Sequence, residues 1–215
     1  FLARRFHPQK GGPDLIDVIK TDGCLTLRIN RPDKANALTE AMLSDLAVAV
    51  EDADQSVLVL TGEGKVFSAG ADLEDVRNGT LATSPAWERL SSAVARFKGL
   101  SLASMNGSCA GGALGMVLAC DLRITVASAK FFYPVIKMGV LPQPSDPARL
   151  AALVGPSRAK RILLAGAKLN ADEAFAIGLV DVISTNTLED DTQKLIEPAR
   201  AANPALVTGI KTLIG

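Results

Sequence analysis

Apolar and polar residues alternate on both sides of a short turn near the start of the chain. Residues 15–30, LIDVIKTDGCLTLRIN, show this period of two around Thr21-Asp22-Gly23, which predicts an antiparallel hairpin. Residues 37–54 then place apolar side chains at helical spacing, with Thr39 as the expected N-cap. Residues 56–62, SVLVLTG, predict a short buried strand, so the order strand, helix, strand indicates a βαβ arrangement.

Short strands and helices continue along the rest of the chain. The segment FSAGADLEDV is expected to be a loop leading into a short helix, and Ser84 and Pro85 then mark the N-cap and first residue of the next helix. Further strands are predicted at 101–107, 121–128 and 130–133, and further helices at 110–120, 146–155 and 156–166. From residue 170 the pattern is mostly helical, with a short strand at 179–183. The predicted organisation is a flexible leader (1–14), a βα core (15–160) and a C-terminal helical region (161–215).

Composition narrows the possible partners. Hydrophobic residues make up 48% of the chain and charged residues 21%, and Lys+Arg and Asp+Glu both number 23. The sequence has no long basic run, so we do not expect it to bind nucleic acid. No apolar stretch reaches the roughly 18 residues that a membrane span needs. Cys24, Cys109 and Cys120 have no paired or metal-like spacing, and the only histidine is His7 in the leader. We therefore expect reduced thiols, a cytoplasmic location, no metal site and no catalysis through histidine.

Two loops are unusually rich in small residues. One lies in FSAGADLEDV, residues 67–76, and the other in GSCAGGALG, residues 107–115. Small side chains let a ligand approach the backbone closely. Close packing between a helix and a strand is the alternative interpretation for each glycine-rich loop taken alone.

Four segments in order resemble the enoyl-CoA hydratase/isomerase, or crotonase, superfamily. They are INRPDKANALT (29–39), VLTGEGKVFSAGADL (59–73), MNGSCAGGALGMVLACDLRI (105–124) and LLAGAKLNADEAFAIGLVDVI (163–183). The resemblance covers the chain from about residue 15 to its end. It implies an α/β, crotonase-like (ClpP/crotonase) spiral of ββα repeats with a C-terminal helical region, assembled as a homotrimer or a dimer of trimers. It also implies an acyl-CoA substrate, with coenzyme A as part of the substrate and no separate cofactor.

The resemblance gives the two small-residue loops a chemical role. A thioester carbonyl that gains negative charge needs preorganised N–H donors about 3 Å away. The family pattern implies the backbone N–H groups of Ala71 and Gly112, the second near the start of an apolar helix whose dipole favours an anion. Segments that would hold the coenzyme A portion supply Lys34, Ala35, Ala37, Ala69, Asp72, Leu73 and Glu74. Asp72 as a helix cap and Lys34 as a solvated charge remain the alternatives for those two residues.

The chain departs from the family at both acid–base positions. Hydratases of the family use two glutamates, one three residues after the oxyanion glycine and one after the proline of an F-x-x-P-E stretch. Gly115 and Val135 occupy these positions here. Adding water to a double bond requires one proton to be removed and one to be supplied, so the two-glutamate hydration mechanism is not expected.

Other polar residues near these positions have competing interpretations. Gln143 stands where several family isomerases and dehalogenases carry an aspartate. Asp146 is expected at a helix N-cap with Pro147 following it, and an acid–base role is its alternative. Tyr133 is expected either to pack in the core or to donate a hydrogen bond to a developing anion. Cys109 has no histidine to activate it as a nucleophile.

These features favour isomerase- or decarboxylase-like chemistry over hydration. Loss of CO₂ from a β-carboxylate leaves an enolate without requiring a protein base to start the step. Two alternatives remain, a non-catalytic acyl-CoA-binding paralogue and an acyl-CoA thioester hydrolase.

Overall fold

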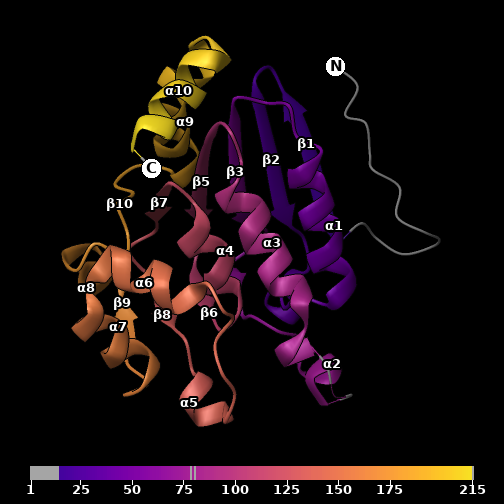
Figure 1. Ribbon diagram of the computed structural model, residues 1–215, viewed down its shortest axis with the longest axis vertical. Helices are drawn as coiled ribbons and strands as arrows, with labels where there is room; N and C mark the ends of the chain where they lie inside the picture. Colours follow the sequence, from indigo (N-terminus) through magenta and orange to yellow (C-terminus); the bar gives the residue numbers. More distant parts are fainter. Residues whose placement is uncertain (1–14, 78, 80, 215) are drawn as a thin grey trace.

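Strands of two sheets run through the molecule, with helices packed on them (Figure 1). The computed structural model describes residues 15–77, 79 and 81–214, so the predicted leader and His7 lie outside the described residues. The larger sheet has the order β1 (Ile16–Thr21), β2 (Cys24–Ile29), β3 (Val57–Gly62), β5 (Leu100–Met105), β7 (Leu122–Thr125), β10 (Val182–Ile183). The smaller sheet has the order β4 (Val66–Ser68), β6 (Ser108–Ala110), β8 (Lys130–Phe132), β9 (Lys168–Asn170).

The two sheets are built by a repeated ββ unit. Each of β3, β5 and β7 enters the larger sheet, and the strand that follows it enters the smaller sheet. Neighbouring strands of successive units pair in parallel in both sheets. This arrangement confirms the predicted spiral of ββα repeats.

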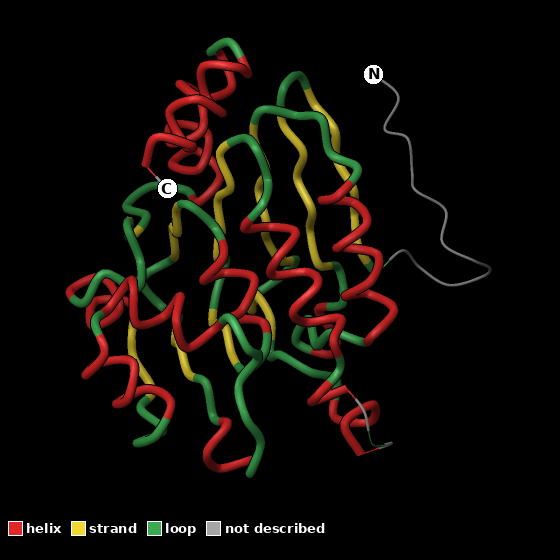
Figure 2. The backbone as a smooth tube through the Cα atoms, in the orientation of Figure 1, coloured by secondary structure: helices red, strands yellow, loops and turns green. Residues whose placement is uncertain are grey.

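The helices follow the strands closely. They are α1 (Glu40–Glu51), α2 (Leu73–Arg77), α3 (Pro85–Ala95), α4 (Ala113–Ala119), α5 (Val135–Met138), α6 (Asp146–Val154), α7 (Pro156–Leu163), α8 (Ala171–Ala176), α9 (Leu188–Ala201) and α10 (Pro204–Ile214), with 3₁₀ turns at Pro32–Lys34 and Leu81–Thr83. Figure 2 shows how α1, α3 and α4 lie across the strands, with α9 and α10 at the opposite end of the molecule from α2 and α5. The described helices include none long and apolar enough to cross a membrane.

Local signals in the sequence account for the first elements. β1 and β2 form the predicted hairpin, with Thr21 paired to Cys24 across a turn in which Gly23 has a φ of 69°. Thr39 is the N-cap of α1, and its hydroxyl accepts a hydrogen bond from the Met42 N–H at 3.2 Å. The predicted hairpin and helix start are therefore confirmed.

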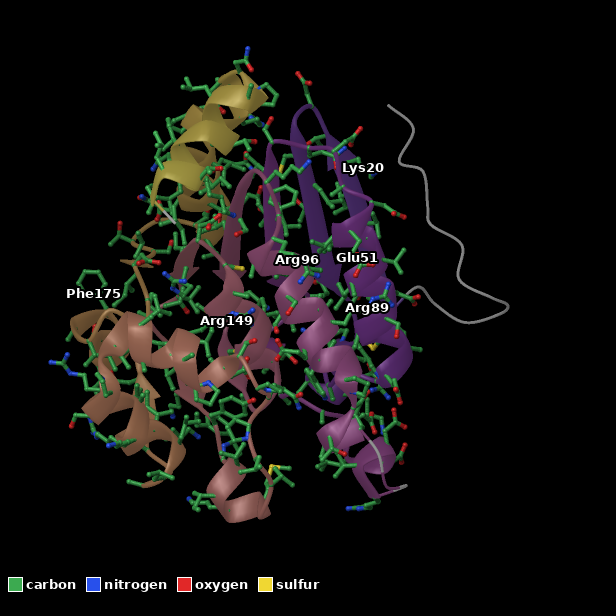
Figure 3. The ribbon with its side chains drawn as sticks, viewed as in Figure 1. Lys20, Glu51, Arg89, Arg96, Arg149 and Phe175 are labelled. Atoms are coloured by element: carbon green, nitrogen blue, oxygen red, sulfur yellow. The ribbon has the colours of Figure 1, made fainter. Side chains whose placement is uncertain are left out.

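Apolar packing on both faces of the larger sheet fixes the framework. On one face, buried leucines of α1 and α3 pack against the strands, and an ion pair between Glu51 and Arg89 joins these two helices at the surface (Figure 3). On the other face, Ile196 of α9 packs with Val57 and Leu102.

The C-terminal region is joined to the core through both sheets. β9 pairs with β8, and β10 pairs with β7. α7 also runs across the boundary expected between residues 160 and 161. The sequence had not indicated the three-residue strands β4, β6 and β9, which are too short to show a period.

Candidate active site

The two small-residue loops meet at the ends of adjacent parallel strands. β4 pairs with β6, and the chain continues from these strands into the loops that contain Ala71 and Gly112. Gly70 has a φ of 94°, and a Cβ at this position would lie 2.7 Å from the Ala110 carbonyl oxygen. Gly70 is therefore required for contact between the loops, which is a structural reason for one of the small residues.

A third loop, residues 31–38, holds the first loop in place. The buried Asn36 amide donates to the carbonyl oxygens of Glu63 at 2.9 Å and Val66 at 2.6 Å. The Ser68 hydroxyl donates to the Asn36 carbonyl at 2.8 Å, and the Ala69 N–H donates to the Ala35 carbonyl at 3.0 Å. Ala35 and Asn36 both have left-handed backbone conformations, so this loop has a specific shape fixed by hydrogen bonds.

Hydrogen bonds within the protein hold the side chain of Asp72. Its carboxylate accepts a hydrogen bond from Arg31 Nη1 at 2.5 Å and from the N–H of Glu74 at 2.9 Å. The hydrogen bond from Arg31 lowers the pKa of the Asp72 carboxyl, although burial opposes the shift. The Asp72 N–H donates to the Leu38 carbonyl. The interpretation of Asp72 as the cap of α2 is thus confirmed.

Several other residues expected near the coenzyme A portion are accessible. The side chains of Lys34, Ala69, Leu73 and Glu74 are exposed, whereas Ala37 is buried. Lys34 lies on loop 31–38 and Ala69 on the loop that leads into α2, whereas Leu73 and Glu74 are the first two residues of α2.

The N–H groups of Ala71 and Gly112 are available as donors. Hydrogen bonds from Leu38 to Gly70 and from Asp72 to Leu38 bracket Ala71 without using its N–H. Gly112 immediately precedes α4 and is its N-cap. Among the described residues, neither N–H donates a hydrogen bond to another group of the protein.

Gly112 also has a packing role. A Cβ at this position would lie 3.0–3.1 Å from the indole ring of Trp87 in α3. The ring is fixed by a 2.8 Å hydrogen bond from its Nε1 to the Leu81 carbonyl. The packing interpretation of this glycine is therefore supported by the structure, and the free N–H is compatible with it.

The space beside Gly115 contains a carboxylate from another helix. A Cβ at Gly115 would lie 2.9 Å from each carboxylate oxygen of Asp146. Asp146 is the first residue of α6, and Ser145 is its N-cap. The expected N-cap role of Asp146 is wrong, because its side chain turns into the protein interior instead of toward the backbone N–H groups of α6. Within the described part of the chain, its carboxylate accepts one hydrogen bond, from the Tyr133 hydroxyl to Oδ2 at 2.7 Å.

Burial dominates the electrostatics of this pair. Asp146 is 1% exposed, and burial raises the pKa of its carboxyl to about 6, even though the Tyr133 hydrogen bond and the charge of Arg149 oppose the rise. Burial and the neighbouring Asp146 raise the pKa of the Tyr133 hydroxyl, which therefore stays protonated as a donor. The Oδ1 atom of Asp146 has no hydrogen-bond partner among the described residues.

Glu88 of α3 anchors the start of α6. Its carboxylate accepts hydrogen bonds from the Ser145 N–H at 3.1 Å and from the Ser145 hydroxyl. Arg149, one turn into α6, donates to the Ser91 hydroxyl of α3 at 2.9 Å (Figure 3). The sequence offered no signal for these contacts, since the two helices are more than 50 residues apart.

The remaining candidates are held in structural positions. Val135 is buried at the first residue of α5, and the Gln143 amide donates to the Ala82 carbonyl at 3.2 Å. Burial raises the pKa of the Cys109 thiol, which disfavours its thiolate. The described residues contain no group of three or more His, Cys, Asp or Glu side chains placed to hold a metal ion.

The sequence and the fold have clear counterparts among known proteins. Residues 20–213 match the sequence profile of the Enoyl-CoA hydratase/isomerase family. A 4-chlorobenzoyl coenzyme A dehalogenase-2 from Arthrobacter sp. is 37% identical over 91% of this chain and 75% of its own length. A crotonyl-CoA hydratase from Syntrophomonas wolfei is 34% identical over 82% of this chain and 72% of its own length.

Solved structures agree with these sequence relatives. A putative enoyl-CoA hydratase/carnithine racemase from Magnetospirillum magneticum is 30% identical, with a TM-score of 0.86 over 94% of this chain and 82% of that one. The DspI structure from Pseudomonas aeruginosa is 31% identical, with a TM-score of 0.84 over 96% of this chain and 88% of that one. The chain therefore belongs to the enoyl-CoA hydratase/isomerase family.

Proposed function

We propose that this protein binds an acyl-CoA thioester and stabilises its enolate oxyanion with the backbone N–H groups of Ala71 and Gly112. The observation that carries the proposal is that these two N–H groups donate no hydrogen bond among the described residues and lie on two loops that contact each other at Gly70 and Ala110. Loop 31–38 fixes one of these loops through hydrogen bonds. Donors fixed before the reaction stabilise developing charge without a cost of reorganisation.

The reaction we propose is isomerase- or decarboxylase-like rather than hydration. Position 115 is a glycine and position 135 is a buried valine, so neither supplies a carboxylate to handle a water molecule. Enolate formation by loss of CO₂ or of a carbon-bound proton relies on the same two N–H donors without needing a positioned water.

The similarity to a 4-chlorobenzoyl coenzyme A dehalogenase makes halide displacement a second candidate. The amide of Gln143 is uncharged and is hydrogen-bonded to the Ala82 carbonyl, so it offers no carboxylate nucleophile. We therefore favour enolate chemistry and treat dehalogenation as an outcome to be tested.

Binding and turnover should be measured together. Calorimetry with coenzyme A, crotonyl-CoA, malonyl-CoA, 3-hexenoyl-CoA and 4-chlorobenzoyl-CoA tests the binding site. Product analysis of the same mixtures then separates decarboxylation, isomerisation, hydration, thioester hydrolysis and chloride release. Failure of the folded protein to bind any of these thioesters would overturn the proposal. Binding without turnover of any would instead support the non-catalytic alternative.

A further inference from the structure

The buried carboxylate of Asp146 occupies the volume into which a side chain at position 115 would project. The two oxygen atoms lie 2.9 Å from the Cβ position of that side chain. In a helix the Cα–Cβ bond tilts toward the N-terminus, so a side chain at 115 would point toward the turn that begins at Gly112. The Asp146 carboxylate therefore lies beside α4 at position 115, three residues after Gly112.

The two oxygen atoms of Asp146 differ in their surroundings. Oδ2 accepts the hydrogen bond from Tyr133, whereas Oδ1 is buried without a hydrogen-bond partner among the described residues. A buried polar atom without a partner costs about 1–3 kcal/mol in folding free energy. A carboxyl needed only for packing would not require this arrangement, whereas a group that exchanges a proton with a ligand needs one free oxygen.

We propose that Asp146 is the acid–base residue of this protein, supplied from α6 to the space that Gly115 leaves open. This inference rests on the proposed function, because it requires an acyl-CoA whose enolate oxygen is held by Ala71 and Gly112. Tyr133 is a positioning residue: its hydroxyl donates a hydrogen bond to Oδ2 of Asp146, so that Oδ1 can face the acyl carbons.

The proton transfer balances without any further reactant. The Asp146 carboxylate removes a proton from the carbon next to the thioester carbonyl, and the C–H electron pair forms the enolate, whose charge rests on the thioester oxygen. Return of a proton from the Asp146 carboxyl to the same carbon regenerates the substrate, and in D₂O the carboxyl gives back a deuteron once it has exchanged its proton with solvent. In a 3-enoyl-CoA, return of the proton to the γ-carbon moves the double bond into conjugation with the thioester.

The charged and titratable groups around Asp146 come from three directions. Arg149 on the same helix lowers the pKa of the carboxyl, and Glu88 on α3 raises it. Tyr133 donates its hydrogen bond from the segment after β8, and α4 contributes no titratable side chain. Burial outweighs these contributions and brings the pKa of Asp146 to about 6, where a carboxyl can both accept and release a proton near neutral pH.

Proton exchange in D₂O tests the role directly. The full chain is incubated with butyryl-CoA, phenylacetyl-CoA or 3-hexenoyl-CoA, and deuterium at the α-carbon is followed by NMR. For a thioester that binds, we expect exchange by the wild-type protein and a loss of about 10²-fold or more in Asp146→Asn. Affinity in this variant should change by only a few fold, since the amide preserves the shape and can still accept from Tyr133. Asp172→Asn, an exposed carboxyl on α8, is the matched control and should exchange at the wild-type rate.

Two further variants separate an acid–base role from a structural one. Tyr133→Phe removes a hydrogen bond that lowers the pKa of Asp146. The exchange rate of this variant should still increase with pH, but the midpoint of the increase should lie at a higher pH than in the wild-type protein. The double variant Gly115→Asp/Asp146→Ala returns the carboxylate to α4 and should recover part of the exchange lost in Asp146→Ala.

The possible failures are distinguishable. Binding with equal exchange in wild type and Asp146→Asn would overturn the role of Asp146 and leave the proposed binding function intact. Binding with no exchange by the wild-type protein on any of the three thioesters would overturn it as well. Absence of binding would overturn both proposals.

Discussion

The burial of Asp146 predicts a pH-dependent stability difference that requires no ligand. The perturbation is Asp146→Asn, which removes the ionisable proton and keeps the size of the side chain. The folded protein holds this carboxyl with a pKa of about 6, whereas an ordinary aspartate has a pKa of 3.8. The folded state therefore favours the protonated carboxyl, whose stabilising contribution is complete below the ordinary pKa and is lost as the pH rises through about 6.

The magnitude follows from the two pKa values. The difference, about 6 minus 3.8, is worth about 3 kcal/mol in unfolding free energy at about 1.4 kcal/mol per pKa unit. About a third of this free energy has already been lost at pH 4.5, because the Asp146 carboxyl is ionised in most unfolded chains at that pH. Between about pH 4.5 and 8, wild type should lose about 2 kcal/mol of unfolding free energy relative to Asp146→Asn. The nearly complete burial of the side chain leaves little room for solvent screening.

Urea unfolding of both proteins and of Asp172→Asn, at several pH values in this range, measures the effect. The difference between wild type and Asp146→Asn should grow with pH by about 2 kcal/mol, and by more than the difference between wild type and Asp172→Asn. Parallel pH profiles for wild type and Asp146→Asn would refute the assignment of a raised pKa to Asp146.

Three more predictions concern hydration activity, the packing of Gly112 and the reactivity of two cysteines. Crotonyl-CoA hydration should be slow, because Gly115 and Val135 supply no carboxylate, and turnover on the order of 10³ s⁻¹ would contradict this expectation. Gly112→Ala should lower the unfolding free energy by about 1–3 kcal/mol, because its Cβ would lie 3.0 Å from Trp87; an unchanged melting temperature would argue against this packing. Cys109 and Cys120 should react slowly with a thiol reagent at pH 8 in the native protein, because burial raises both pKa values, that of Cys120 to about 12; rapid labelling before unfolding would contradict this.

Much of the fold could be predicted from the sequence because its signals are local. The hairpin turn at Gly23 and the cap at Thr39 depend on residues that are neighbours in the chain. The family resemblance added the spiral of ββα repeats, which no local pattern specifies. The three-residue strands β4, β6 and β9 were missed because their existence depends on pairing with distant partners, as when β4 pairs with β6.

The candidate site was predictable only in part. The small residues around Gly70 and Gly112 indicated close approach, but whether to a ligand or to protein could not be decided without knowing that Ala110 and Trp87 lie beside them. Asp146 followed by Pro147 fits a helix N-cap by sequence alone. The direction of the Asp146 side chain depends on its hydrogen bond with Tyr133, 13 residues earlier, and on the absence of a side chain at Gly115. Neither residue is local to the start of α6.

The measurement that tests the account most directly is a crystal structure of the protein with a bound acyl-CoA thioester that it does not consume. The account predicts that the thioester oxygen lies about 3 Å from the backbone nitrogens of both Ala71 and Gly112. The carbon next to the carbonyl should face Oδ1 of Asp146. A thioester oxygen out of hydrogen-bonding reach of both nitrogens, or an acyl-CoA bound elsewhere on the molecule, would contradict the central claim.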